Sequence, residues 1–360
     1  MASANAFLAS GRAALQRKGS PLSLSPSRPM GAGDFEVLAR YSSPDTRSTS
    51  LIFLFTGEGA HVVAAAQTPT AGELCKLGDS SSNVEAALAH AGLPSLDALL
   101  TTALGQHTAP LSPVVTTVLN LLNAHRWQAA GHVPSIAVGH SIGEVAAAHV
   151  SGLLSVADAI RLAHGLGRIG ARLTGGMLHT RVSRRELVYM RAVAVARSAW
   201  APAQPWEDEL LSIAAINDAP PAGTTNASSP GARDVGVSLC GAHEQVQAWL
   251  DTDPNSERLP PLHPWHHPAY AQLPDVTTAL DCLPRGPPGA SSTHGRVVFV
   301  SACRPEVVQS LDATYWLQWL SQPGEARYER PAACADHRPR DCSCLAAHTR
   351  ICACICGPRA

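Results

Sequence analysis

The chain has 360 residues, with 27 lysines and arginines against 28 aspartates and glutamates. This near-neutral balance argues against a polyanion-binding surface, so nucleic acid is not an expected partner. No apolar run approaches the roughly 20 residues that cross a bilayer, so a membrane is not an expected partner either. A hydrophobic content of 45 % with 15 % charged residues predicts a globular protein with a substantial core.

The N-terminal region has a composition of its own. The first 33 residues include Arg12, Arg17, Lys18 and Arg28, and no acidic residue precedes Asp34. This pattern fits a transit peptide, which would direct the protein to a plastid, and equally an extension or linker on a cytoplasmic protein. We therefore predict that residues 1–47 form an N-terminal extension.

The predicted elements of the large body come first along the chain. Apolar runs and helical spacing predict these elements: a strand at 50–55, helices at 81–100 and 111–127, a strand at 135–138, and helices at 142–154 and 156–173. A small α+β unit is predicted next: strands at 177–182, 211–216 and 235–240, a helix starting at 183, and a helix at 243–250. The chain then returns to the large body through a strand at 296–300 and a helix at 311–320.

Six of the ten cysteines crowd into the C-terminal residues 324–360. Cys-x-Cys pairs near His337 and His348 suggest a zinc site, but their spacing matches no common zinc finger or knuckle. We find no helical or strand periodicity in this segment. We therefore expect an atypical tail outside the folded domain. The other four cysteines are scattered, as in a reduced intracellular protein.

The turn at Ser141 is the strongest chemical signal in the sequence. An apolar strand ends in Gly139-His140-Ser141-Ile142-Gly143, and a helix follows at once. A Gly-x-Ser-x-Gly turn bends so sharply that only glycines fit beside the serine, which is left exposed at a helix N-terminus. Backbone N–H groups there can stabilise an oxyanion. The pattern predicts a nucleophilic serine.

A nucleophilic serine at neutral pH needs a base, usually histidine. The side chain of His140 is expected to point away from the neighbouring serine hydroxyl. The downstream group of His263, His266 and His267 is the better source of the base.

Three ordered motifs resemble the acyltransferase domains of type I polyketide synthases and the related malonyl-CoA:acyl-carrier-protein transacylases. Residues 55–60 (FTGEGA) resemble the family motif FTGQGA, and residues 139–154 (GHSIGEVAAAHVSGLL) resemble the nucleophile motif. Residues 258–268 (RLPPLHPWHHP) align without gaps with the family sequence RLPVSHAFHSP. Shorter matches at 175–178, 214–217 and 311–316 support the resemblance, which covers about residues 48–323.

This resemblance implies an α/β fold. It would consist of a parallel-sheet, α/β-hydrolase-like body with a small ferredoxin-like α+β subdomain inserted. The large subdomain would comprise residues 48–176 and 257–323, and the small one residues 177–256. The active site would lie between them.

The resemblance also implies roles for individual residues. Ser141 would be the acylated nucleophile and His266 its base, and the backbone N–H groups of Ile142 and Glu58 would form the oxyanion hole. The substrate-binding positions would be Leu166, His263, Trp265, His140 and Asn217.

The implied reaction is a ping-pong transfer in polyketide or fatty-acid biosynthesis. Ser141 would take an acyl group from coenzyme A and give it to the phosphopantetheine arm of an acyl carrier protein. Other synthase domains are further implied partners. Coenzyme A enters as a substrate carrier, and no metal or other cofactor is required.

Two positions that depart from the family bear on the acyl group. At Glu58 the family has glutamine, although only the backbone would be used there. The alignment places Leu166 where the family has the arginine that grips the carboxylate of a malonyl group. Because leucine cannot pair with a carboxylate, Leu166 favours an uncharged acyl group. Arg168 or Arg172 could supply the missing charge after a local shift.

The sequence around His263 gives an opposing indication. His263 and an aromatic residue at 265 resemble the malonyl-selective members, although Trp265 is bulkier than their phenylalanine and would narrow the pocket. The sequence alone leaves the choice of acyl donor open.

Two other functions were weighed against the transacylase. A serine esterase would need an acidic residue between the serine and the histidine in chain order. Four candidates are available, Asp208, Asp234, Asp251 and Asp253, but none follows a convincing core strand. An inactive docking-type domain would explain Leu166 and Glu58, but both Ser141 and His266 are retained.

Overall fold

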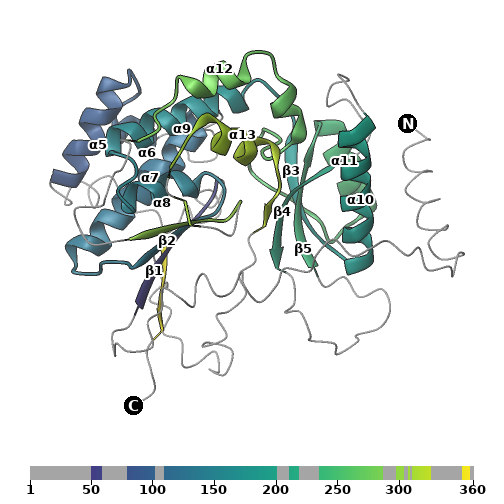
Figure 1. Cartoon of the computed structure of the whole chain (residues 1–360), viewed down its shortest axis with the longest axis horizontal. Coiled ribbons are helices and arrows are strands. Elements are labelled where there is room, and N and C mark those ends of the chain that lie inside the picture. Colours follow the sequence, from purple (N-terminus) through teal and green to yellow (C-terminus); the bar gives the residue numbers. More distant parts are fainter. Residues whose placement is uncertain are drawn as a thin grey trace, which may run out of the picture.

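The computed structural model describes residues 50–58, 79–101, 109–200, 211–218, 235–286, 297–303, 307–308, 310–325 and 351–356. The predicted extension at 1–47 lies outside these residues. Two sheets, each with its own helices, lie side by side (Figure 1). The predicted α/β fold class is confirmed.

The larger body is built on a four-stranded sheet with the order β7-β2-β1-β9. Strands β7, β2 and β1 are parallel to one another, and β9 is antiparallel to β1. The strands are β1 (Ser50–Phe55), β2 (Ile136–Gly139), β7 (Val298–Ser301) and β9 (Ile351–Cys356). The helices are α5 (Asp79–His90), α6 (Leu96–Thr101), α7 (Leu111–Ala129), α8 (Gly143–Val150), α9 (Val156–Gly170), α12 (Val276–Asp281), α13 (Ala313–Ser321) and the 3-10 helix η3 (Pro268–Gln272).

The smaller body is a β-α-β-β-α-β unit whose sheet has the order β6-β3-β5-β4-β8. The unit comprises β3 (Gly176–Val182), α10 (Arg184–Trp200), β4 (Ser212–Asp218), β5 (Val235–Gly241), α11 (His243–Thr252) and β6 (Glu257–Arg258). Neighbouring strands of this unit are antiparallel, and α10 and α11 cover one face of the sheet (Figure 1). The sheet also takes β8 (Gly324–Glu325), which lies beyond the predicted limits of 177–256 and pairs parallel to β4.

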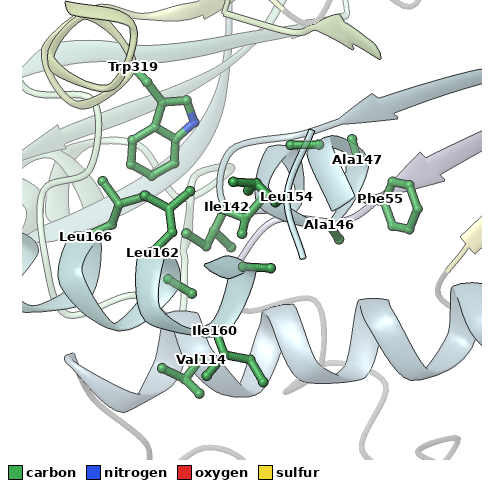
Figure 2. Packing of buried hydrophobic residues seen from close by; sticks show 14 of the residues in the cluster. Phe55, Val114, Ile142, Ala146, Ala147, Leu154, Ile160, Leu162, Leu166 and Trp319 are labelled. Carbon is green, nitrogen blue, oxygen red and sulfur yellow. The ribbon is translucent and has the colours of Figure 1, made fainter. Parts of the chain in front are cut away.

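Helix α7 runs through the centre of the larger body, and its residues from Ser112 to Ala124 are all buried. Helix α9 packs against α7 and has a clear amphipathic pattern, with Ile160, Leu162 and Leu166 fully buried. Figure 2 shows Leu162 and Leu166 under the indole of Trp319, with Ile142 at the start of α8 next to Leu162, while Ile160 lies beside Val114 of α7. The core of the larger body therefore reaches up to the turn that carries Ser141.

Two expectations about local structure were wrong. The helix expected over 81–100 is two helices, α5 and α6, because Gly92 adopts a φ of 66° and Pro94 follows it closely. The C-terminal tail was expected to lie outside the folded domain, but residues 351–356 form β9 against β1. That segment alternates cysteine with isoleucine or alanine, which is a period-two pattern typical of a strand.

Other expectations are only partly testable. The side chains of the tail cysteines that suggested zinc lie outside the described residues. In the part of the chain that the structure describes, no helix is long and apolar enough to span a membrane. The same part contains no group of three or more His, Cys, Asp or Glu side chains that could hold a metal ion.

Gly143 offers a test of how closely α8 approaches β1. A Cβ atom at this position would lie 2.5 Å from the carbonyl oxygen of Phe55 and 2.7 Å from that of Thr56. Overpacking against backbone cannot relax by a side-chain rotation, so Gly143→Ala is expected to lower the free energy of unfolding by about 3 kcal/mol or more. Urea denaturation measures this loss.

The matched control is Gly324→Ala, because a Cβ atom there would meet nothing closer than 3.9 Å. Its free energy of unfolding is expected to stay close to that of the wild type. Equal losses in the two variants would contradict the close approach of α8 to β1.

Candidate active site

Ser141 lies at the sharp turn between β2 and α8, with a left-handed φ of 52°. The turn is anchored by the backbone N–H of His140, which donates to the carbonyl of Phe55 at 2.8 Å. A Cβ atom on Gly139 would lie only 2.2 Å from the backbone nitrogen of Glu144. Only glycine fits there, so the sequence pattern and this strained conformation have the same steric cause.

The hydroxyl of Ser141 meets the imidazole of His266 across 125 residues of sequence. The Oγ–Nε2 distance is 2.9 Å, and the other ring nitrogen, Nδ1, lies 2.6 Å from the carbonyl oxygen of Trp319. Because a carbonyl can only accept, we assign the proton of the neutral ring to Nδ1. Nε2 is then free to accept the proton of Ser141, which is the tautomer that a general base requires.

Backbone strain and the helix α13 both help to hold this pair. His266 has a φ of 62°, so both members of the pair occupy the left-handed region. The indole Nε1 of Trp319 donates to the backbone carbonyl of Ser141 at 3.2 Å. Trp319 thus contacts Ser141 through its side chain and His266 through its backbone.

The pKa of His266 is lowered to about 4, chiefly by burial and to a smaller extent by the nearby His140. The hydrogen bond to the Trp319 carbonyl acts in the opposite direction, since it favours the protonated ring. The imidazole is therefore neutral at physiological pH and available as a base.

Two backbone N–H groups near Ser141, those of Ile142 and Glu58, were predicted to form an oxyanion hole. The backbone at Gly57 is so close to the nucleophile that an added Cβ atom would lie 3.1 Å from the Ser141 Cβ. This approach brings the start of the Glu58 residue alongside Ser141. Within the described residues, the N–H groups of Ile142 and Glu58 have no hydrogen-bond acceptor. Free donors on both sides of the serine suit a developing negative charge.

The side chain of Glu58 turns into the protein. Its Oε1 accepts a hydrogen bond from the hydroxyl of Ser112 at 2.7 Å. Burial raises the pKa of Glu58 to about 7, and the Ser112 hydroxyl and the Trp265 indole partly oppose this rise. The indole N–H is close enough to act on the pKa but falls short of hydrogen-bond geometry, so Trp265 Nε1 and Glu58 Oε2 both lack a hydrogen-bond partner among the described residues.

An apolar wall stands where the family arginine was expected. Leu166 is fully buried on α9 and lies under the Trp319 indole (Figure 2). Trp265 is 2 % exposed and its ring fits over Gly170, where an added Cβ atom would overlap it at 2.2 Å. Trp265 also packs on Trp319, with 5.8 Å between the ring centroids. The wall of Leu166, Trp265 and Trp319 carries no positive charge.

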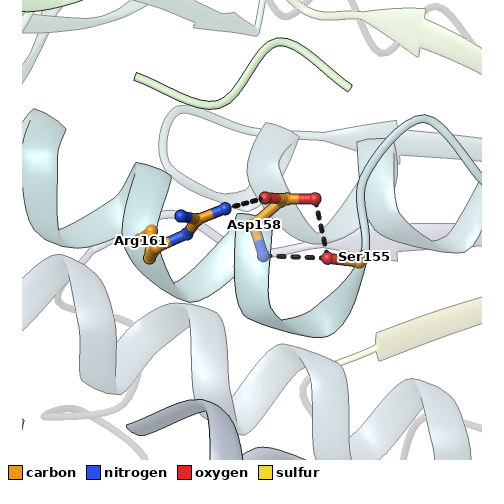
Figure 3. Close-up of polar contacts among 3 residues, drawn as sticks. All are labelled: Ser155, Asp158 and Arg161. Atoms are coloured by element: carbon orange, nitrogen blue, oxygen red, sulfur yellow. Dashed lines mark hydrogen bonds and ion pairs between the residues drawn. The ribbon is translucent and has the colours of Figure 1, made fainter. Parts of the chain in front are cut away.

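The arginines of α9 point away from this wall. Arg161 and Arg168 of α9, and Arg172 just beyond its C-terminal end, line a groove of about 790 Å³ between α9 and the C-terminal end of α12. On the helix, Arg161 and Arg168 lie on the face opposite Leu166. Figure 3 shows the guanidinium of Arg161 bonded to Asp158, whose carboxylate also meets Ser155 at the start of the helix. Arg172 donates to the carbonyl of Pro274. The shift that would place Arg168 or Arg172 in the role of the missing arginine is therefore not observed.

The other predicted substrate positions surround the pair less directly. His263 is buried, and its Nδ1 lies 3.0 Å from the carbonyl of Leu173 while its Nε2 has no partner. His140 lies beside Asn217 of the smaller body, which favours its protonated form, although burial lowers its pKa overall. Asn217 also donates to Ser238 at 2.9 Å. His140 and Asn217 thus join the two bodies next to Ser141.

Sequence reasoning missed two contributors to the site. Trp319 orients His266 through a backbone carbonyl, which no side-chain pattern can reveal. Ser112, in the first turn of α7, donates a hydrogen bond to Glu58. The only hint of this contact in the sequence was Glu58 itself, because a buried carboxyl needs a hydrogen-bond donor. Both residues lie on helices that were predicted from the sequence. The prediction therefore included the helices but not the roles of these two residues.

A parallel α/β body, a serine at a strained strand–turn–helix junction and a histidine bonded to it define an acyl-transfer type of site. Comparison with known proteins narrows this class. The acyl transferase domain family matches residues 52–196. Residues 52–196 thus match an acyl transferase domain, and the proteins that this chain resembles are polyketide synthases and, in fold, acyltransferases and transacylases.

The similar curated proteins are large synthases. The chain is 36 % identical over 138 residues to the non-reducing polyketide synthase aoiG of Aspergillus oryzae, a match that covers 36 % of this chain and 6 % of that protein. It is 31 % identical over 215 residues to the erythronolide synthase EryA2 of Saccharopolyspora erythraea, covering 59 % of this chain and 5 % of that protein. The chain therefore spans a small part of these relatives.

Solved structures share the fold. A loading acyltransferase from the avermectin modular polyketide synthase superposes with a TM-score of 0.56 at 24 % identity, covering 78 % of this chain and 81 % of that one. The transacylase MCAT from Streptococcus pneumoniae gives a TM-score of 0.53 at 18 % identity, covering 76 % of this chain and 81 % of that one.

The pH dependence of stability tests the buried carboxyl of Glu58. Because the folded state raises its pKa from 4.5 to about 7, the proton stabilises the fold fully below pH 4.5, and this stabilisation is lost as the pH rises through 7. Glu58→Gln does not titrate. Its free energy of unfolding is expected to rise relative to the wild type by on the order of 3 kcal/mol between about pH 4 and about pH 8. Urea denaturation at each pH measures the difference.

Glu257→Gln, which removes an exposed carboxyl, is the control and should leave the pH curve of the wild type nearly unchanged. If the curves of Glu58→Gln and the wild type run parallel over this range, Glu58 is not the buried, proton-binding group described above.

Proposed function

We propose that this protein is an acyl-CoA:acyl-carrier-protein transacylase that works through an acyl-serine at Ser141. The observation that carries the proposal is the 2.9 Å contact between Ser141 Oγ and His266 Nε2, with Nδ1 of the same ring held by the Trp319 carbonyl. This geometry gives the serine a base in the correct tautomer, next to unpaired backbone donors.

In the first half-reaction, Ser141 Oγ attacks the thioester carbonyl while His266 Nε2 takes its proton. The N–H groups of Ile142 and Glu58 bind the oxyanion of the tetrahedral intermediate. The bond to sulfur then breaks, and His266 returns the proton to the departing coenzyme A thiolate. The product is an ester on Ser141 and free coenzyme A.

The second half-reaction reverses these roles. The thiol of the carrier protein's phosphopantetheine arm gives its proton to His266 and attacks the Ser141 ester. The tetrahedral intermediate collapses, and His266 protonates the leaving Ser141 oxygen. The acyl group is now on the carrier, and the enzyme has returned to its starting state.

A serine esterase is less well supported, because no carboxylate orients the histidine. In the part of the chain that the structure describes, the Nδ1 of His266 bonds to a backbone carbonyl. Of the four candidate aspartates, Asp208 and Asp234 lie outside the described residues, Asp251 is exposed, and Asp253 bonds to Thr180. An esterase triad with a carboxylate on Nδ1 would have to displace the Trp319 carbonyl.

An inactive docking domain is the second candidate. Leu166 and Glu58 favour it, because both depart from the family pattern near the acyl group. The assembled Ser141–His266 pair argues against it, since a site without a reaction has no need for two residues in strained backbone conformations. Because burial raises the pKa of Glu58 to about 7, a large part of this carboxyl is protonated near neutral pH, and the protonated form carries no charge that would repel an oxyanion.

We propose an uncharged acyl group as the donor. Leu166, Trp265 and Trp319 form an apolar wall, and the α9 arginines lie on the opposite face of that helix. A malonyl carboxylate buried against this wall would lack a partner at a cost of several kcal/mol, on the order given for unpaired buried charge. The proposed partners are thus acyl-CoA, an acyl carrier protein and other domains of a synthase. The proposed location is the cytoplasm, or a plastid if residues 1–47 act as a transit peptide.

Acyl loading read by intact mass tests the proposed function. Purified protein is incubated with acetyl-, propionyl- or malonyl-CoA, with Ser141→Ala as the blank. We expect a mass increase with the two uncharged donors, little with malonyl-CoA, and none in the variant. Folded protein that gains no mass from any donor would instead support the docking domain.

Leu166→Arg tests the basis of donor choice. An arginine in the apolar wall can pair with a carboxylate by two parallel hydrogen bonds, so the ratio of malonyl to acetyl loading is expected to rise at least about tenfold. Leu166→Met keeps the volume without the charge and should leave the ratio near that of the wild type. Equal ratios in the two variants would rule out position 166 as the determinant of charge preference.

A further inference from the structure

Glu144 is a fully buried carboxylate in the first turn of α8, three residues after Ser141. Its Oε1 accepts hydrogen bonds from the hydroxyl of Ser301 at 2.9 Å and from the backbone N–H groups of Ala302 at 2.8 Å and Cys303 at 3.1 Å. Its Oε2 accepts a short hydrogen bond from the hydroxyl of Tyr315. One side chain therefore joins α8, the end of β7 and the helix α13.

These four contacts satisfy the carboxylate. Burial raises the pKa of Glu144, and the hydrogen bonds from Tyr315, Cys303, Ser301 and Ala302 all oppose that rise. Every contact is a donor pointing at an oxygen, so the two oxygens act only as acceptors. A buried carboxyl with this many donors is a rigid anchor, because moving any of its partners would leave a polar atom unsatisfied.

The bond to Tyr315 transmits this rigidity to the candidate active site. Tyr315 and Trp319 are four residues apart on α13, so they lie about one helical turn apart on the same face. Trp319 is the residue whose carbonyl accepts from His266 and whose indole donates to Ser141. The start of α8 is thus joined to α13 twice, by Glu144–Tyr315 and by Ser141–Trp319.

We propose that Glu144 and Tyr315 are positioning residues: their hydrogen bond sets the place of α13, and thereby holds the Trp319 carbonyl against His266. The proposal rests on the transacylase function proposed above for the Ser141–His266 pair. Neither residue touches the reacting atoms. Each acts through α13. The other contact that holds α13 near Ser141 is the longer, 3.2 Å hydrogen bond from the Trp319 indole to the Ser141 carbonyl.

Tyr315→Phe cuts this tie and keeps the packing of the ring. The matched control is Thr180→Val, which also removes a hydroxyl that donates to a buried carboxylate, that of Asp253 at 3.2 Å in the smaller body. Both variants lose a bond of the same kind, so their losses of stability are expected to be comparable. Only Tyr315→Phe lies on the path to His266.

The first readout is the second-order rate of Ser141 with phenylmethylsulfonyl fluoride. In this reaction the Oγ–sulfur bond forms, fluoride leaves and His266 takes the serine proton, so the rate reports the Ser141–His266 pair without any acyl donor. We expect Tyr315→Phe to slow it by about 10- to 100-fold, as misplacement of a base does, and Thr180→Val by less than about twofold. Equal rates in the two variants would overturn the proposal.

The second readout is acyl transfer. Tyr315→Phe is expected to lower kcat with little change in KM for acyl-CoA, because binding of the donor does not depend on the base. If the wild type reacts with the sulfonyl fluoride but takes no acyl group, the transacylase function fails while the positioning role is still tested by the first readout. A changed KM with unchanged kcat would contradict the positioning role.

Glu144→Gln is a conservative variant that should keep the hydrogen bonds of Glu144 while removing its charge. Its amide oxygen can accept from Ser301, Ala302 and Cys303, and its amide nitrogen can donate to the Tyr315 oxygen, so a rate within about threefold of the wild type is expected. A rate as low as that of Tyr315→Phe would show that charge, and not the tie, supports the pair. If Tyr315→Phe does not fold, Glu144→Asp replaces it, because the shorter side chain cannot reach both α13 and β7. Wild-type reactivity in Glu144→Asp would overturn the proposal.

Discussion

The backbone carbonyl of Trp319 is the constraint on which the candidate active site depends. It lies 2.6 Å from His266 Nδ1 and so fixes the tautomer that leaves Nε2 open toward Ser141. A carboxylate in this place would add a negative charge and favour the imidazolium. A carbonyl does so more weakly, and together with burial it leaves His266 with a pKa of about 4. The base is therefore kept neutral by its surroundings.

The Trp319 carbonyl can hold His266 in place only because three distant segments of the chain meet at the candidate active site. Gly139 and Gly143 let α8 begin directly against the C-terminal ends of β1 and β2, and this close approach fixes the position of Ser141. Gly170 makes room for the ring of Trp265 next to His266, so α9 seats the loop that carries the base. Helix α13 closes the arrangement from the other side. Each close approach involves a position where a side chain would collide, which explains why these glycines, and not the catalytic residues alone, define the site.

The sequence predicted the parts of this site that depend on side-chain chemistry and local steric limits. The turn at Ser141 was visible because its glycines and strand-to-helix change lie within nine residues of one another. The pairing with His266 came from the family resemblance, since sixteen histidines allow many chance partners. The role of Trp319 was not predictable, because any residue offers a backbone carbonyl and only the tertiary fold selects one. The break between α5 and α6 follows from Gly92 and Pro94, which the helical spacing on both sides of them obscured. The alternating residues of β9 form a strand because they pair with β1, and a local pattern does not reveal such a distant partner.

The two departures from the family pattern are physically coupled. Glu58 lies close to Trp265, and Leu166 lies under Trp319, which packs on Trp265, so an arginine at 166 would place its charge against the same pair of indoles. A positive charge there would stabilise the carboxylate and hold Glu58 ionised next to the oxyanion. With leucine at 166, burial instead raises the pKa of Glu58 to about 7 and favours the protonated form, which has the shape and charge of the family's glutamine. On the function proposed above, leucine at 166 and a glutamate that can be protonated at 58 are mutually compatible, and both suit an uncharged acyl group.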